Sequence, residues 1–180
     1  MKTDLCAPVP QKASKPGKLG LDRFLTYRLH VLNKITDRVT DELYQRETGL
    51  SLSDCRCIAA IGHFVPLSIN DLAAHANLDK SQASRAAQKL VNSNIASRTS
   101  RAHDNRGVDL VLTKVGQTIY EQIIQIATQR NDDVFSCLSK PERELFSSLL
   151  DRLVSNAKSN VKMPAKTRAI TESFTRKIRA

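Results

Sequence analysis

The sequence predicts a mainly helical protein with one small β-hairpin. Three observations support this: long stretches in which apolar residues recur every three or four positions, short polar residues at the spacing of helix caps, and one alternating apolar–polar run beside a glycine-containing turn. The chain has 180 residues, of which 41% are hydrophobic and 26% charged. These values suit one folded domain with tails.

The first two helices follow from apolar periodicity and from the residues that end it. Apolar positions at steps of three and four predict a long helix over residues 21–47, which Gly49 ends. Ser53 is expected to cap a second helix, and Pro66 is expected to stop it.

The next two helices are marked by two capping boxes. Ser68 with Asp71, and then Asp79 with Gln82, have the spacing at which the two side chains satisfy each other's backbone amides. They predict a short third helix over 69–76 and a fourth helix that runs to about residue 93.

A hairpin and two further helices complete the pattern. Residues 95–101 and 108–112 flank a polar turn, and the second run alternates as a half-buried strand should. Thr113 is expected to cap a fifth helix, and Ser139 with Glu142 begins a sixth.

Positive charge is concentrated at the two ends of the chain. The chain has 28 Lys and Arg against 18 Asp and Glu, a formal charge of +10. Residues 1–20 are interpreted as a flexible basic leader, residues 21–157 as the folded domain and residues 158–180 as a basic tail. Within the domain, residues 79–106 are basic and the remainder is mildly acidic, which favours a local phosphate-facing surface.

The leader lacks a secretory signal and no apolar run is long enough to span a membrane, so a cytoplasmic protein is predicted.

Cysteine and histidine spacing indicates no metal site, cofactor or disulfide framework. Cys6, Cys55, Cys57 and Cys137 are scattered, and the four histidines have no ligand spacing. Cys55 and Cys57 are expected to be one buried and one half-exposed thiol. A redox-sensing role stays open because Arg56 lies between them and a cation lowers a thiol pKa.

No nucleophile–base pair, paired acids or phosphate loop appears, so the chain is not expected to be an enzyme.

Residues 68–93 have the pattern of a helix-turn-helix. Three alanines allow two helices to approach closely, and Asn77 suits the turn between them. The second helix then presents hydrogen-bonding and basic side chains that suit a DNA major groove, namely Lys80, Ser81, Gln82, Ser84 and Arg85. The alternative is a helix pair that serves only as a scaffold.

Residues 95–112 form the predicted hairpin, or wing. Arg101 and Arg106 near its tip are expected to enter a minor groove, and Asp104 is expected to brace Arg106. The alternative is an exposed hairpin whose charges provide solubility.

At this point the chain resembles the MarR (multiple antibiotic resistance regulator) family of bacterial winged helix-turn-helix repressors, from residue 21 to about residue 157. Asp104-Asn105-Arg106, followed by Leu110-Val111-Leu112-Thr113 and Gly116, is similar to the family's wing signature. Ser81, Ser84 and Arg85 match its recognition-helix pattern, and residues 138–142 match the start of its final helix. Asn94 departs from the glycine of many members, and the basic tails have no counterpart in the pattern.

The resemblance implies an intertwined helical homodimer built by the first, fifth and sixth helices. Such a dimer would bind double-stranded DNA at a pseudo-palindromic operator, and would be associated with the bacterial nucleoid when bound. It also implies release by a small aromatic or phenolic acid. Polar residues on the first two helices that suit such an effector are Tyr27, Arg28, His30, Arg56 and His63.

The predicted function is therefore a ligand-responsive transcriptional repressor. Two alternatives remain from the sequence. One is a thiol-switched regulator that uses Cys6, Cys55 or Cys57. The other is a nonspecific architectural nucleic-acid-binding protein whose affinity comes from the basic tails and falls steeply with salt.

Overall fold

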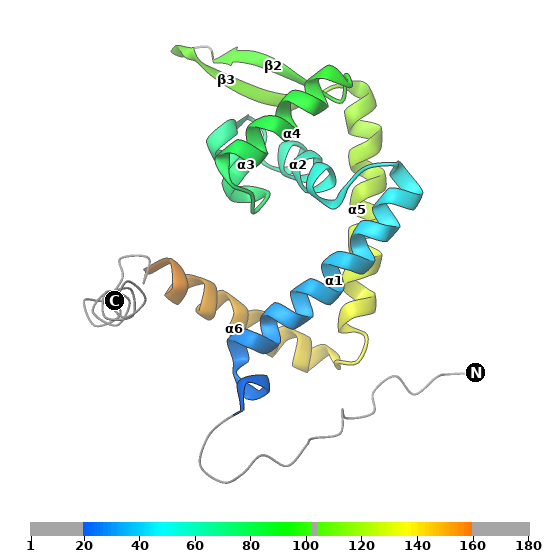
Figure 1. The fold of residues 1–180 in the computed structure, drawn as a ribbon, viewed down its shortest axis with the longest axis vertical. Coiled ribbons are helices and arrows are strands. Elements are labelled where there is room, and N and C mark those ends of the chain that lie inside the picture. The colour runs from blue at the N-terminus through cyan, green and yellow to red at the C-terminus, as the bar shows by residue number, and fades with distance from the viewer. Residues whose placement is uncertain (1–19, 102–103, 160–180) are drawn as a thin grey trace, which may run out of the picture. The chain divides into compact units, whose positions relative to one another are not determined.

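The computed structural model describes residues 20–101 and 104–159, with the backbone alone at residues 101 and 104–107 (Figure 1). The chain divides into two compact units, residues 1–134 and 135–180, and each is described by itself.

The first unit holds most of the helices and the sheet. Its elements in chain order are the 3-10 helix Leu21–Arg23, α1 (Leu25–Thr48), α2 (Leu52–His63), β1 (Leu67–Ser68), α3 (Ile69–His75), α4 (Lys80–Asn92), β2 (Ala96–Arg101), β3 (Asp104–Leu112) and α5 (Lys114–Phe135). The second unit contains α6 (Lys140–Ser159). The predicted class, mainly helical with a small hairpin, is confirmed. None of the helices in the described ranges is long and apolar enough to cross a membrane.

The first two helices begin and end close to the predicted residues, with one correction. Gly49 ends α1 in the left-handed conformation, with φ of 70°. The cap of α2 is Ser51 and not Ser53, because Ser51 has the extended backbone of a cap and its Oγ accepts a hydrogen bond from the Asp54 amide at 3.2 Å. The Ser53 hydroxyl lies inside the first turn, 3.0 Å from the Ser51 Oγ.

The caps of α3 and α4 are formed by the residues predicted. The Ser68 side chain accepts a hydrogen bond from the Asp71 amide. At α4 the reciprocal box is complete, since the Asp79 carboxylate accepts from the Gln82 amide and the Gln82 side chain accepts from the Asp79 amide.

The sheet has one strand more than the sequence predicted. Its order is β1–β3–β2 with both pairings antiparallel, and the hairpin of β2 and β3 is the predicted one. The added strand, β1, pairs Leu67 with Leu110. Two residues are too few to show an alternating pattern, so periodicity gave no signal for this strand.

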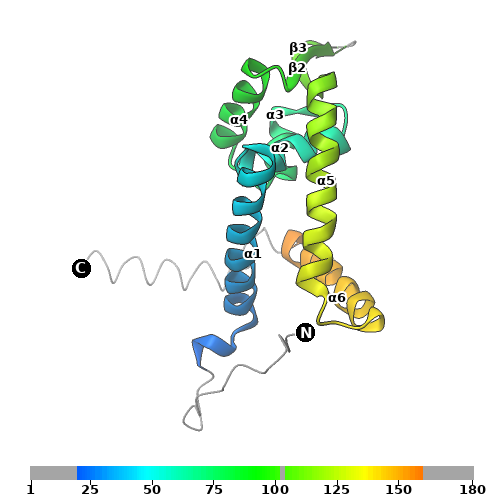
Figure 2. The same cartoon turned by 90° about the vertical axis from the view of Figure 1, so that its right-hand side faces the viewer.

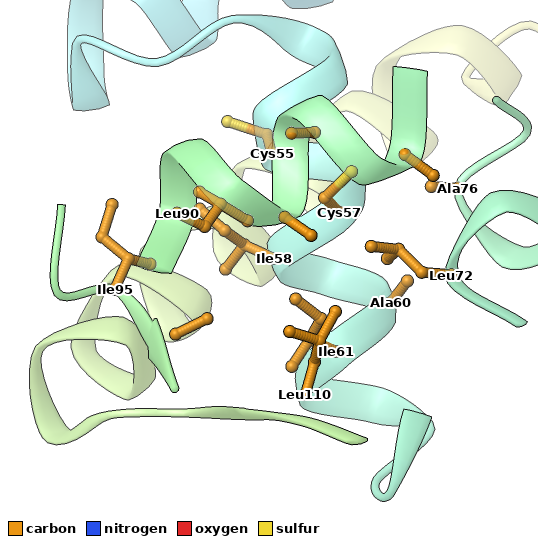
Figure 3. Close-up of a cluster of buried hydrophobic side chains, with 14 of the residues drawn as sticks. Cys55, Cys57, Ile58, Ala60, Ile61, Leu72, Ala76, Leu90, Ile95 and Leu110 are labelled. Carbon is orange, nitrogen blue, oxygen red and sulfur yellow. The ribbon is translucent and has the colours of Figure 1, made fainter. Parts of the chain in front are cut away.

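The core of the first unit surrounds α2. Figure 3 shows Ile58 and Ile61 of α2 among apolar side chains from α3, α4 and β3, including Leu72, Leu90 and Leu110. All five are at most 1% exposed. Figures 1 and 2 show α3, α4 and the β2–β3 hairpin gathered around this helix. The core therefore fixes the helix-turn-helix and the root of the hairpin to one helix.

Cys55 and Cys57 are both fully buried, so the expectation of one half-exposed thiol was wrong. The two side chains leave α2 in different directions, but protein surrounds the helix on both sides (Figure 3). Burial raises the pKa of the Cys55 thiol to about 11 and that of Cys57 to about 12. Among the described cysteines, Cys137 alone is exposed, and Cys6 lies outside the described residues.

Two helices carry apolar side chains that the chain itself leaves uncovered. On α1 these include Leu25 and Ile35, which are 70% and 53% exposed. On α6, which has no buried residue, they are Leu145, Leu149, Leu153 and Val154. Apolar rows of this extent are typical of surfaces that another chain covers.

Candidate nucleic-acid interface

The helix-turn-helix is closed by small residues and one left-handed turn. Asn77 has φ of 55°, a conformation that asparagine tolerates better than most residues. The Leu78 amide then donates to the Ala73 carbonyl at 2.9 Å. On α4, Ala83 and Ala87 are fully buried and Leu90 is 1% exposed, so this face of the helix packs on the core.

The opposite face of α4 is exposed to solvent. It carries all five predicted contact residues, Lys80, Ser81, Gln82, Ser84 and Arg85. A hydroxyl, an amide and a guanidinium on one exposed face provide donors and acceptors for base edges and phosphates. The carbonyl oxygen of Gln82 is occupied by the cap, at 3.0 Å from the Asp79 amide, so its NH₂ group is what remains to donate.

The wing projects next to α4 (Figure 1). Its two strands pair from Ala96 opposite Leu112 to the tip, with an irregularity between Ser100 and Arg101. The side chains of Arg101, Asp104 and Arg106 lie outside the described part of the structure. Their predicted roles in the minor groove, and the brace between Asp104 and Arg106, remain predictions.

The root of the wing is tied to α4 and α5 by residues at its two ends. The Arg98 guanidinium donates to the side-chain oxygen of Gln88 on α4 at 2.8 Å. Thr113 donates from its Oγ1 to the Asn94 carbonyl at 2.7 Å and accepts from the Gly116 amide at 3.0 Å.

Gly116 lies against the backbone at this root. A Cβ placed at Gly116 would lie 2.0 Å from the Ile95 carbonyl oxygen, so a side chain has no room. The Thr113-x-x-Gly116 part of the signature therefore joins the hairpin to the first turn of α5.

Sequence reasoning missed an ion pair between α2 and α4. The Lys89 ammonium donates to the Asp54 carboxylate at 2.5 Å, across 35 positions of sequence. Asp54 lies three residues after Ser51, the spacing of a capping box, and that was the available signal for Asp54. Its long-range partner has no signal in a single sequence.

The predicted effector residues separate into two groups. Arg56 and His63 line a cleft of about 410 Å³. Phe64, His75 and Ile124, which the sequence did not predict as effector residues, line it as well. Tyr27, Arg28 and His30 do not line this cleft and lie on the exposed first turns of α1.

The cleft is lined in part by aromatic rings and by the Arg56 guanidinium, which forms an ion pair with Asp37. The rings of Phe64 and His75 stack with centroids 3.8 Å apart, and His63 meets Phe64 edge-on. The Arg56 guanidinium donates to the Asp37 carboxylate of α1 at 2.6 Å, and both side chains are about one-third exposed, at 35% and 31%. Among the described residues, no group of three or more His, Cys, Asp or Glu could hold a metal ion.

Comparisons with known proteins agree with this geometry. Residues 48–107, from the end of α1 to the wing, match the sequence model of the MarR family. No curated protein sequence matches the chain.

Solved structures share the fold over most of the chain. A MarR/EmrR family transcriptional regulator from Acinetobacter sp. ADP1 is 21% identical, with a TM-score of 0.72 over 78% of this chain and 99% of that one. A mutant of Escherichia coli MarR, complexed with operator DNA, is 22% identical, with a TM-score of 0.63 over 72% of this chain and 92% of that one.

A third similar structure is Bordetella bronchiseptica BpsR, described by the regulation of its DNA binding by 6-hydroxynicotinic acid. It is 17% identical, with a TM-score of 0.68 over 77% of this chain and 98% of that one.

Another similar structure, from Silicibacter pomeroyi, is itself a transcriptional regulator of the MarR family and is 23% identical, with a TM-score of 0.67 over 76% of this chain and 92% of that one. The matched segment contains the helix-turn-helix and most of the wing, and the solved structures extend the likeness to the surrounding helices. Residues 48–107 therefore resemble the MarR family in sequence, and the chain has the fold of solved MarR-family transcriptional regulators.

Proposed function

We propose that this protein is a ligand-responsive repressor of the bacterial cytoplasm that binds a pseudo-palindromic operator as a homodimer. The observation that carries the proposal is the exposed polar and basic face of α4 beside a projecting hairpin. In a winged helix-turn-helix this helix enters the major groove and the hairpin reaches the neighbouring groove.

Dimerisation is supported by the uncovered apolar rows on α1 and α6. Leu25 of α1 and Leu145 of α6 are 70% and 62% exposed, and a second copy would remove such surfaces from water. A two-fold dimer presents two α4 helices to half-sites separated by about one helical turn of DNA, roughly 34–36 Å. The operator should therefore be a pseudo-palindrome with fixed spacing.

The cleft at Arg56 and His63 supports an acidic aromatic effector. A guanidinium binds a carboxylate strongly, and the stacked rings of Phe64 and His75 offer a flat surface to a second ring. Because Arg56 already pairs with Asp37 of α1, an effector carboxylate would have to compete with that link. Such competition would couple the cleft to the position of α2 against α1.

The thiol-switched alternative receives no support from α2. Cys55 and Cys57 are buried, and their pKa values of about 11 and about 12 keep both as neutral thiols near pH 7. Thiolates are the reactive form, so these two residues are poorly suited to sensing oxidants.

The test of the proposal is sequence preference at fixed salt. An operator is first selected from a pool of random duplexes, and its dissociation constant is compared with that of a scrambled duplex by fluorescence anisotropy. We expect a preference of about 10³-fold or more. Equal affinity for both duplexes, with a steep loss in salt, would instead identify a nonspecific architectural protein.

Spacing gives the control for dimeric binding. Inserting about 5 base pairs between the half-sites places them on opposite faces of the duplex, and the preference should be lost. A thermal-shift screen of aromatic acids then tests the effector. A compound that raises the melting temperature should also lower the operator affinity.

A further inference from the structure

An unusual ion pair lies directly behind the DNA-facing surface of α4. Lys89, in the last turns of α4, donates to the Asp54 carboxylate at 2.5 Å. The Asp54 side chain is 5% exposed, whereas that of Lys89 is 59% exposed. The pair therefore joins a buried acid on α2 to a solvent-facing cation on α4.

Contacts within α2 hold the Asp54 carboxylate in place independently of Lys89. Its Oδ2 accepts a second hydrogen bond, from the Ser51 hydroxyl at 2.7 Å, and its own amide donates to the same hydroxyl. It also lies in the first turn of α2, where the helix dipole favours negative charge. The Asp54 carboxylate is therefore a fixed hydrogen-bond acceptor, and the flexible side chain of Lys89 extends from α4 to reach it.

Apolar packing between α4 and the start of α2 is interrupted by a hollow. This hollow has a volume of about 290 Å³, and Asp54, Arg85 and Lys89 are among its lining residues. The core side of α4 consists of three alanines and Leu90, so most of its apolar contacts are made by short side chains. Next to this hollow, the Asp54–Lys89 ion pair joins the two helices in addition to the apolar contacts of the core.

The angle of α4 matters because its contact residues lie far from Lys89 along the axis. Ser81 and Lys89 are eight positions apart, or about 12 Å at 1.5 Å per residue. A tilt of about 10° about Lys89 would move Ser81 by about 2 Å, which is enough to break hydrogen bonds to a base edge. Nonspecific phosphate contacts tolerate such a shift better, because long cationic side chains can follow it.

We propose that Asp54 and Lys89 form a positioning pair that sets the angle of α4 and thereby the operator specificity, with Lys89 held by Asp54 and not by a DNA phosphate. This proposal rests on the DNA-binding function proposed above. It assigns the ammonium of Lys89, which charge alone would count as a phosphate contact, to the buried carboxylate of Asp54.

The test compares four variants: Asp54→Asn, Lys89→Met, Lys89→Arg and the Asp54→Asn/Lys89→Met double variant. Arg46→Met, which removes an exposed cation on α1, controls for the change in net charge. For each protein the affinities for the operator and a scrambled duplex are measured over a range of salt concentrations.

We expect Asp54→Asn and Lys89→Met each to reduce the operator preference by about tenfold or more. Lys89→Arg should retain it because arginine keeps the ion pair. The double variant should be no worse than the single ones, since either change already removes the same contact. The slope of affinity against salt should stay at the wild-type value, as it should for Arg46→Met.

The opposite pattern would overturn the proposal. If Lys89→Met weakens both duplexes equally and lowers the salt slope by about one counterion while Asp54→Asn has no effect, Lys89 is a phosphate contact. If the wild-type protein itself shows no operator preference, the proposed function fails instead.

A measurement without DNA separates these two failures. Hydrogen exchange of the free protein should be faster in the α4 amides, residues 80–92, of Asp54→Asn and Lys89→Met, and unchanged in α5. Unaltered exchange in α4 would refute the positioning role whatever the DNA results.

Discussion

The two ion pairs of α2 hold the same helix to different partners in different surroundings. Asp54 faces Lys89 of α4, and its carboxylate is almost completely buried. Arg56, two residues later, faces Asp37 of α1, and both side chains are about one-third exposed. Residues two apart on a helix point to nearly opposite sides, so α2 links the long helix α1 to α4, the proposed DNA-contacting helix.

The difference in burial indicates two different roles. A buried carboxylate that loses its partner has no water to replace it, so the Asp54–Lys89 pair should be costly to break. In the Asp37–Arg56 pair, Arg56 lines the proposed effector cleft, and this more exposed pair can exchange one carboxylate for another at lower cost. A fixed link to α4 and an exchangeable link to α1 would let an effector change the α1–α2 contact while α4 keeps its place on α2.

The largest expected effect is on stability and tests the contrast directly. Lys89→Met should lower the free energy of unfolding by about 2 kcal/mol, because the buried Asp54 carboxylate keeps only its hydrogen bond from the Ser51 hydroxyl. Arg56→Met, which removes the pair whose side chains are about one-third exposed, should cost less than about 1 kcal/mol. Urea denaturation of both variants measures the difference, and equal costs would remove the distinction between the pairs.

The second effect concerns the effector. Arg56→Met should weaken binding of an aromatic acid by about tenfold or more, through the loss of a charge-assisted hydrogen bond, and leave operator affinity intact. Asp37→Asn is the matched control, since it frees Arg56 and should tighten effector binding. Isothermal titration calorimetry measures both, and a response unaltered by either variant would place the effector elsewhere.

A smaller effect concerns Cys55 and Cys57, the two buried thiols of α2. With pKa values of about 11 and about 12, Cys55 and Cys57 should resist iodoacetamide near neutral pH, while the exposed Cys137 reacts. Because folding raises both pKa values above the ordinary 9.0, the stability that depends on neutral thiols is complete below pH 9. It is lost as the pH rises through about 11.

Peptide mass spectrometry of the alkylated protein gives the rates for each cysteine. Fast labelling of Cys55 or Cys57 in the folded protein would show that the core around α2 opens readily, and would restore the thiol-switched alternative.

The smallest effect is expected at an exposed cap that has no link to α2. Hydrogen bonds from the Ser139 hydroxyl and amide lower the pKa of Glu142 at the start of α6. Because folding lowers this pKa, its contribution is present above the ordinary value of 4.5 and is lost as the pH falls through the folded value. Glu142→Gln should therefore lower the melting temperature slightly at pH 7 and not at pH 3, as calorimetry at the two pH values would measure.

Local chemistry in the sequence predicted most of the elements. The caps at Ser68 and Asp79 and the turn at Asn77 depend on neighbours within a few residues, and all three are present in the structure. The cap of α2 was placed two residues late, because Ser51 and Ser53 are chemically equivalent and only the backbone distinguishes them.

What the sequence could not provide is the identity of distant partners. The five residues on α4 were found because they are the polar and basic side chains of its first two turns, and all five are exposed. In the sequence alone, Lys89 cannot be distinguished from a lysine that contacts DNA. Only the structure shows that it pairs with Asp54, 35 positions away. The cleft likewise combines His63 with His75 and Ile124 from other helices, and no spacing rule joins them.

The exposed apolar side chains of α6 have a consequence for the turnover of the protein in a cell. A helix of 20 residues with no buried side chain gains little from its own chain, so in the proposed dimer its order depends on the second copy. Newly made copies that have not yet met a partner would offer this helix to proteases, and paired copies would be protected. Turnover would then fall as synthesis rises, and a minimum rate of production would be needed before the regulated genes are silenced.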